Sequence, residues 1–132
     1  MIRKDRYGIF TETRKTFEEA LDSLRASLQA NGFGVLWEID VKATMKKKLD
    51  ADVPDQVILG ACNPPVALKA LTAEPEIGLL LPCNCTVRRE GERVILGAVS
   101  PHALMGLTAR NDLGPFADQI AAALEKILEE AR

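Results

Sequence analysis

Apolar residues recur along the chain with two different periods, and each period predicts one kind of element. Between residues 17 and 28 they return every three or four positions, with charged residues on the other side, which is typical of an amphipathic helix. Thr16 and Glu19 have the spacing of a capping box at its start, and Asn31-Gly32 suits its end. A second long helix with one apolar stripe is predicted from about Pro115 onwards.

Alternating or continuous apolar runs predict the strands. Residues 34–41 alternate with a period of two. One face carries Val35, Trp37, Ile39 and Val41, which we expect to face a core, and the other carries Leu36, Glu38 and Asp40. Further strands are expected at residues 5–11, 56–62, 79–88 and 93–99, the last two joined as a hairpin around Gly91. Short helices are expected at residues 42–50, resting on Met45 and Leu49, and 65–73, with irregular chain after Pro101.

These elements predict a single α+β domain over residues 1–132. Each long helix has only one apolar stripe, so both must lie on a sheet, most simply on the same face. The hairpin makes that sheet at least partly antiparallel. We therefore expect a two-layer sandwich, with a largely antiparallel, curved sheet of about five strands, two long helices on one face and short connecting helices.

Composition and charge narrow the classes of partner. The chain is 47% hydrophobic and 27% charged, which is ordinary for a globular protein, and its net charge of −2 disfavours nucleic acid and anionic membranes as partners. No apolar run is long enough to span a bilayer, and no secretion signal is evident. Three cysteines, an odd number, are typical of free thiols in a reducing compartment, so we expect a cytoplasmic protein without a cofactor.

Several short segments carry a resemblance to a known family. They are Gly32-Phe33, Glu38-Ile39-Asp40-Val41, Cys62-Asn63-Pro64 and Leu81-Pro82-Cys83, with Val87 following. In order and spacing, from about Phe17 to Pro101, the chain resembles the domain of unknown function 302 family. The resemblance implies a compact α+β arrangement similar to that of TATA-binding protein, self-association as a homodimer, and no established activity. Cys85 departs from the aliphatic residue expected at its position.

Cys62 is the first candidate for chemistry. It comes at the predicted end of a buried strand, just before a helix that we expect Pro65 to begin. The unpaired N–H groups and positive partial charge of a helix N-terminus favour a thiolate over a thiol, and Asn63 could add a hydrogen bond. The alternative is that Cys62 is a small packed residue, since cysteine is among the most buried residue types.

Cys83 and Cys85 are separated by one residue, so on a strand both side chains point to the same face. With Cys62 and His102 they could form a soft-metal site for Zn²⁺ or Cu⁺. The spacing is not the C-x₂-C of common structural zinc sites, however, and cysteines in an apolar strand more often pack than bind a metal. We therefore assign no metal site.

Other polar residues are weaker candidates. His102 is the only histidine and follows Ser100-Pro101, where it suits either a site or ordinary surface. Glu38 and Asp40 share a strand face, as paired catalytic carboxylates do and as solvated surface residues also do. They are candidates for contacting a ligand or for capping nearby backbone.

The sequence leads to one preferred hypothesis and two alternatives. The preferred one is a small-ligand-binding or thiol-dependent domain, with Cys62 as nucleophile, Cys83 as its partner and a pocket formed by Asn63, Pro64 and Pro82. The first alternative is a non-catalytic homodimeric or partner-binding module whose cysteines only pack. The second is a soft-metal or haem carrier. Whether the protein is an enzyme stays open.

Overall fold

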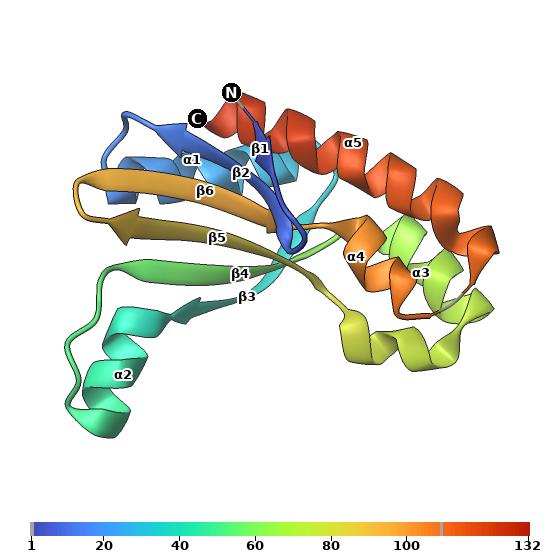
Figure 1. The fold of residues 1–132 in the computed structure, drawn as a ribbon, viewed down its shortest axis with the longest axis horizontal. Coiled ribbons are helices and arrows are strands. Elements are labelled where there is room, and N and C mark those ends of the chain that lie inside the picture. The colour runs from blue at the N-terminus through green and yellow to red at the C-terminus, as the bar shows by residue number, and fades with distance from the viewer. Residues whose placement is uncertain (1, 109) are drawn as a thin grey trace.

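A computed structural model describes residues 2–108 and 110–132, and it consists of one sheet with its two long helices on one face (Figure 1). The strands are β1 (Arg3–Lys4), β2 (Gly8–Thr13), β3 (Gly34–Asp40), β4 (Gln56–Cys62), β5 (Cys83–Glu90) and β6 (Arg93–Val99). The helices are α1 (Phe17–Ala30), α2 (Val41–Leu49), α3 (Pro64–Ala73), α4 (Pro101–Gly106) and α5 (Gly114–Ala131), with two 3₁₀ helices, η1 (Pro75–Leu80) and η2 (Asn111–Leu113).

The sheet has the strand order β1-β2-β6-β5-β4-β3, and all neighbouring strands are antiparallel. β5 and β6 form the expected hairpin, in which Gly91 has a φ of 62° that favours glycine. The predicted α+β sandwich is therefore confirmed, with the short β1 as a sixth strand. None of the described helices is both long and apolar enough to cross a bilayer.

The main core lies between the sheet and the pair α1 and α5. Its centre consists of fully buried leucines from α1, the sheet and α5, namely Leu24, Leu28, Leu59, Leu96, Leu124 and Leu128. Burying each such side chain contributes about 1.5–3 kcal/mol. The two helices are also linked directly, because the hydroxyl of Ser27 donates a hydrogen bond to the carbonyl of Ile127 at 2.8 Å. These contacts make the helix pair one layer.

The ends of α1 match the sequence prediction. Thr16 is the N-cap. Its side chain accepts a hydrogen bond from the backbone N–H of Glu19, and the side chain of Glu19 accepts one from the backbone N–H of Thr16, which completes a capping box. Asn31 follows the last turn and Gly32 has a φ of 81°, as expected for a residue that ends a helix in the left-handed conformation.

The expected orientation of β3 holds for Val35, which packs against the main core, but was wrong for Trp37 and Ile39. Trp37 and Ile39 lie on the sheet face opposite α1 and α5, with 36% and 42% of their surfaces exposed, while Glu38 points to the helix side. The register explains this arrangement: Glu38 lies opposite the buried Leu59, and a bulge between Val35 and Trp37 shifts the pairing.

Two aromatic rings lie over glycines on this open sheet face. A Cβ atom added to Gly60 would come within 2.4 Å of the Trp37 ring, and one added to Gly97 within 2.9 Å of the Phe10 ring. A side chain at either position would therefore have to displace the ring that lies over it.

Three other boundaries differ from the sequence prediction. The first long strand covers Gly8–Thr13 rather than 5–11, because the carboxylate of Asp5 accepts hydrogen bonds from the N–H groups of Tyr7 and Gly8 and forms a turn there. The segment from Leu79 to Pro82 precedes β5 instead of belonging to it. The chain after Ser100 begins with a helix, α4, which Ser100 caps.

The expected helix at 42–50 is present as α2, but it does not rest on Leu49, which is 72% exposed. Its carboxyl end is closed by Asp50 in the left-handed conformation, with a φ of 53°. In Figure 1 α2 projects away from the sheet at the end opposite α3 and α4.

Candidate functional site

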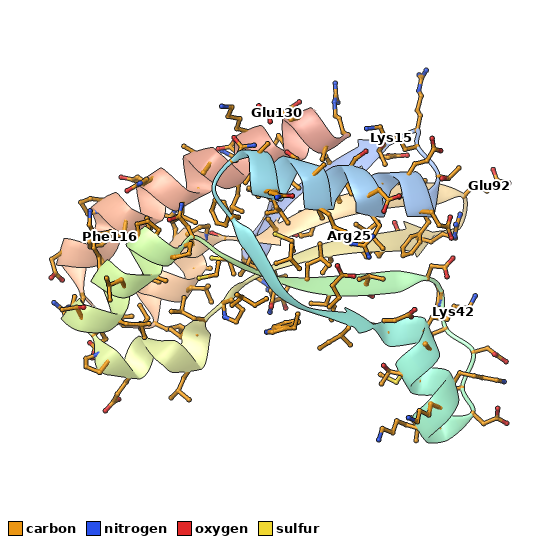
Figure 2. The ribbon with its side chains drawn as sticks, turned by 180° about the vertical axis from the view of Figure 1, so that it is seen from behind. Lys15, Arg25, Lys42, Glu92, Phe116 and Glu130 are labelled. Atoms are coloured by element: carbon orange, nitrogen blue, oxygen red, sulfur yellow. The ribbon has the colours of Figure 1, made fainter. Side chains whose placement is uncertain are left out.

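The helices at one end of the sheet form a partly open cavity of about 270 Å³. One wall consists of the ends of β4 and β5, and the facing walls come from α3, α4 and the first turns of α5. Figure 2 shows Phe116 of α5 in this helical group, far from Lys42 of α2 at the other end of the molecule. The cavity therefore combines segments that are distant in the sequence.

The cavity wall is almost entirely apolar. Ala67 and Leu71 of α3, Met105 of α4 and Phe116 of α5 are among its lining residues. Among the described lining residues none carries a formal charge, and the polar side chains are Asn63 and the thiols of Cys62 and Cys83. Leu36 and Leu71, which are 61% and 38% exposed, also line the cavity, so its rim is apolar as well.

Cys62 and Cys83 lie on the same cavity wall. Ala61 is the cross-strand partner of Cys83, so Cys62 is the next residue along β4 and the last of that strand. Burial, and to a smaller extent the neighbouring Cys62, raise the pKa of the Cys83 thiol to about 11. Cys83 is therefore a protonated thiol at neutral pH, and Cys62 and Cys83 are both partly exposed.

Cys85 takes no part in this wall. It is fully buried in the main core, on the same face of β5 as Cys83, opposite Leu59 and Ala98. Burial, followed by the effect of Cys83, raises the pKa of its thiol to about 12. Cys85 therefore acts as a small apolar core residue.

The start of α3 differs from the anion-favouring terminus that the sequence suggested. The helix begins at Pro64, and Pro64 and Pro65 have no N–H group to offer to a thiolate. The next N–H, that of Val66, donates to the side-chain oxygen of Asn63 at a long 3.4 Å. Asn63 is thus the N-cap of α3, and the local N–H donors expected to activate Cys62 are absent or already used.

The two prolines among the candidate ligand-binding residues lie in different places. Pro82 lines the cavity between Leu81 and Cys83, after a cis peptide bond. Pro64 is the first residue of α3 and is not one of the lining residues.

Glu38 and Asp40 lie outside the cavity and have structural partners. The carboxylate of Glu38 accepts hydrogen bonds from Arg25 of α1 at 2.7 and 2.6 Å, and this pairing holds the pKa of Glu38 below its usual value. Asp40 caps α2 by accepting a hydrogen bond from the N–H of Ala43 at 2.9 Å. Both carboxylates therefore stabilise elements rather than line the cavity.

His102 also lies apart from the thiols. Its Nε2 is 2.6 Å from a carboxylate oxygen of Asp118, and both side chains are largely exposed. Within residues 2–108 and 110–132, no group of three or more His, Cys, Asp or Glu side chains is placed to hold a metal ion. The four-residue soft-metal set considered from the sequence is thus not assembled.

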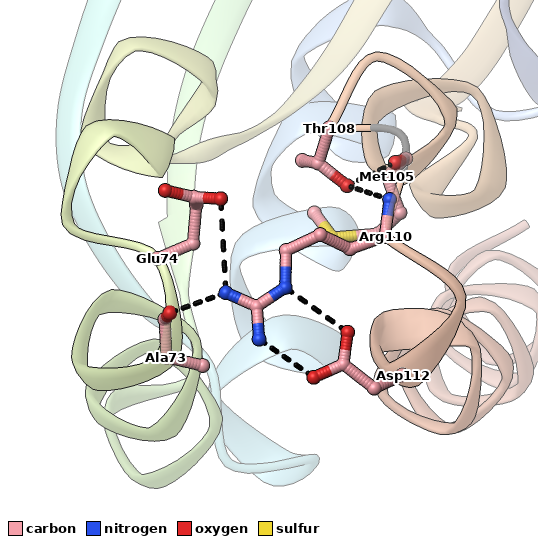
Figure 3. Close-up of polar contacts among 6 residues, drawn as sticks. All are labelled: Ala73, Glu74, Met105, Thr108, Arg110 and Asp112. Carbon is pink, nitrogen blue, oxygen red and sulfur yellow. Dashed lines mark hydrogen bonds and ion pairs between the residues drawn. The ribbon is translucent and has the colours of Figure 1, made fainter.

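Arg110 connects two of the cavity walls, a role that the sequence did not suggest (Figure 3). Its guanidinium donates to the carbonyl of Ala73 at the end of α3, lies 3.7 Å from Glu74, and forms a two-point pair with Asp112 at 3.0 and 2.6 Å. This pairing raises the pKa of Arg110 and lowers that of Asp112. The side chain therefore ties the end of α3 to the segment that leads into α5.

Comparison with known proteins gives a family but no activity. The family described as "Domain of unknown function DUF302" matches residues 9–131. The chain belongs to the DUF302 family. The crystal structure of an uncharacterized conserved DUF302 protein from Bacillus stearothermophilus is similar, with a TM-score of 0.88 and 29% sequence identity over 93% of this chain and 96% of that one. No curated protein matches, so a function for this DUF302 domain must be argued from its own site.

Proposed function

We propose that this DUF302 domain binds a small apolar molecule in the cavity beside Cys62 and Cys83. The observation that carries the proposal is the cavity itself, about 270 Å³ in volume and lined by apolar side chains, two thiols and one amide. Small-molecule sites are usually concave and mainly apolar, with a few polar groups that orient the ligand. At this volume the ligand is smaller than a typical drug.

The energy of an unfilled cavity supports a binding role. The cavity is partly open, so its apolar lining side chains face solvent instead of protein, which forfeits the free energy that their burial would contribute. An apolar ligand would recover part of this energy, whereas water gains little from walls that offer so few hydrogen bonds.

Cys62 is the reactive candidate within this site. It is partly exposed at the end of β4 and lines the cavity, so a bound ligand would contact its sulfur. Asn63, next in the chain, is the one amide among the described lining residues and is the group suited to orient a polar atom of the ligand. Any thiol-dependent reaction would start at Cys62, with Cys83 behind it as a protonated partner.

The test combines ligand binding with protection of the thiol. A neutral, apolar N-phenyl-naphthylamine dye is titrated into the reduced protein, and alkylation of Cys62 by iodoacetamide is then followed by peptide mass spectrometry. We expect saturable fluorescence enhancement and a slower alkylation of Cys62 at saturating dye. Dye that saturates without protecting Cys62 would place the binding site elsewhere and contradict the proposal.

A variant on the open sheet face provides the control for this test. Ile39 is exposed and apolar but does not line the cavity. The Ile39→Ser protein is expected to bind the dye with unchanged affinity. If its affinity falls instead, the dye binds the open sheet face rather than the cavity.

A second candidate function, homodimer formation, is favoured by the same open sheet face. Trp37 and Ile39 are large apolar residues that remain 36% and 42% exposed, and an exposed apolar sheet face is a common site of association. We expect Ile39→Glu to convert a dimer into a monomer, while Leu68→Glu, at an exposed leucine of α3, leaves it dimeric. Light scattering that shows a monomer at all concentrations would contradict this function.

The cellular location is part of the same proposal. The three cysteines are free thiols, which suits a reducing compartment, and the proposed location is therefore the cytoplasm. Fractionation of cells that express the tagged protein tests this directly.

A further inference from the structure

Cys62 and Cys83 occupy diagonally neighbouring positions on the paired strands β4 and β5. Ala61 is the direct cross-strand partner of Cys83, and Cys62 is one residue further along β4. For diagonal neighbours on antiparallel strands the Cα atoms are about 6 Å apart, which is inside the range found for disulfides. Both residues line the cavity at this end of the sheet, and Cys62 is close enough to contribute to the raised pKa of Cys83.

The Cys83 thiol is held in its protonated form. Both cysteines are partly exposed and line the cavity, so a reagent in the cavity can reach this wall. Burial raises the pKa of Cys83 to about 11, so Cys83 is a poor first nucleophile at neutral pH. We therefore assign the first attack to Cys62 and the second to Cys83.

We propose that Cys62 and Cys83 form a reversible dithiol–disulfide site that reacts with small, neutral disulfides entering the cavity. The proposal goes beyond apolar ligand binding, because it depends on the two sulfur atoms rather than on affinity for the cavity. The third cysteine, Cys85, is sealed in the core two residues from Cys83 and remains a thiol.

The reaction balances as two successive thiol–disulfide exchanges. In the first, the Cys62 sulfur, after losing its proton, attacks one sulfur of the small disulfide; a new S–S bond forms, the original one breaks, and the leaving thiolate takes up a proton. In the second, the Cys83 sulfur attacks the sulfur of Cys62 and displaces the other half of the reagent, which takes the proton of Cys83. Two protein thiols are oxidised, and one small disulfide is reduced to two thiols.

The disulfide would close a loop of the chain. The segment between Cys62 and Cys83 consists of α3, η1 and the residues that lead into β5. A closed loop stabilises a protein mainly by restricting its unfolded chain, so oxidation of the pair should stabilise the fold.

The test uses hydroxyethyl disulfide, a small neutral reagent, on the reduced full-length protein without oxygen. After quenching with iodoacetamide, peptide mass spectrometry reports the state of each cysteine. We expect an intramolecular Cys62–Cys83 disulfide with Cys85 alkylated only after unfolding. A mixed disulfide on Cys62 that persists without resolving, or no reaction at Cys62, would overturn the proposal.

Single variants separate the two steps. Cys83→Ser is expected to accumulate the mixed disulfide at Cys62, and Cys62→Ser to slow oxidation of Cys83 at least tenfold. Cys85→Ala, whose fold is checked by circular dichroism, serves as the matched control and should form the disulfide as the wild type does. Reaction of Cys83 at the wild-type rate in Cys62→Ser would refute the proposed order.

Failure of the disulfide can be told apart from failure of ligand binding. The naphthylamine dye is titrated into the fully reduced wild-type protein, in which the cavity lining is unchanged. Normal dye binding without disulfide formation in the wild type would overturn only the redox site, whereas disulfide formation without dye binding would overturn only the apolar ligand site.

Discussion

Ala67→Leu fills the cavity from the middle of α3 and is expected to stabilise the protein while it weakens ligand binding. Ala67 is partly buried and lines the cavity. Leucine adds three carbon atoms, and at about 0.8 kcal/mol per buried carbon this is worth roughly 2.4 kcal/mol. Lost rotamer freedom offsets about 0.5–1 kcal/mol. The expected net gain is therefore about 1.5 kcal/mol, or about 6 °C in Tm for a chain of this size.

The same substitution has the opposite effect on the dye. A ligand that occupies the cavity must displace the leucine side chain, and the free energy gained by burying that side chain is then lost. The Kd of the naphthylamine dye should therefore rise about tenfold, the equivalent of about 1.4 kcal/mol. Both quantities are measured on one preparation, by urea unfolding followed by circular dichroism and by fluorescence titration. The unfolding gives the free energy, and the titration gives the affinity.

Ala122→Leu is the matched control, since Ala122 is exposed on α5 and does not line the cavity. Its effect on stability should stay within about 0.5 kcal/mol. If both variants have the same stability and the same dye affinity, the added side chain does not enter a cavity at α3. A destabilised Ala67→Leu with unchanged dye binding would likewise refute the reasoning.

Three further predictions test contacts outside the thiol pair. Glu38→Gln should cost at most about 1 kcal/mol at pH 7. Arg25 lowers the native pKa of Glu38, so this stabilisation is present above the unfolded pKa of about 4.3 and is lost as the pH falls through the native pKa. The unfolding free energies of the two proteins in urea should therefore become equal near pH 2. A difference that stays constant with pH would contradict the assignment. Gly60→Ala should push Trp37, the only tryptophan, off the sheet and shift its emission to longer wavelength, and an unchanged spectrum would rule out the observed ring position. Arg110→Ala should speed hydrogen exchange at the carboxyl end of α3 and leave the β5–β6 hairpin protected, whereas equal protection of α3 in both proteins would show that the guanidinium does not hold it.

Local signals explain why α1 could be predicted in detail. Its apolar stripe, the Thr16–Glu19 capping box and Gly32 are all encoded within a few residues of one another, and the structure uses each of them. The hairpin around Gly91 is equally local. Such features need no information about the rest of the chain.

The orientation of β3 shows where local information ends. Alternation identified the strand, but a period of two does not say which of its faces a helix will cover. The apolar set with Trp37 and Ile39 looked like the core face, yet Glu38 is the residue that meets α1, through Arg25. The bulge at Val35 and the glycine beneath Trp37 set this choice, and both depend on β4.

The candidate site also contains one part that short motifs predicted and one part that depends on the tertiary arrangement. Cys62, Asn63, Pro82 and Cys83 were selected from short motifs at the ends of two strands, and all four line one cavity. The opposite walls gave no signal, because Met105 lies in a segment expected to be irregular and Phe116 was assigned only to the apolar stripe of a helix. A residue that lines a cavity and one that fills a core follow the same apolar pattern, so only the tertiary arrangement distinguishes them.

The position of the cavity also bears on how it opens. The main core between the sheet and the pair α1 and α5 is one cluster, whereas Ala70, Ile77 and Leu113 form a second, smaller one beneath α3 and η1. A small cluster provides less burial energy, so the segment from α3 to η1 should separate from the sheet more easily than α1 does. Arg110 holds this segment to the start of α5 from outside, and a Cys62–Cys83 disulfide would hold it at its base. Because α3 follows directly on β4, the sheet holds its amino end in either redox state, and Arg110 holds its carboxyl end, so opening of this wall should be most sensitive to loss of the Arg110 contacts.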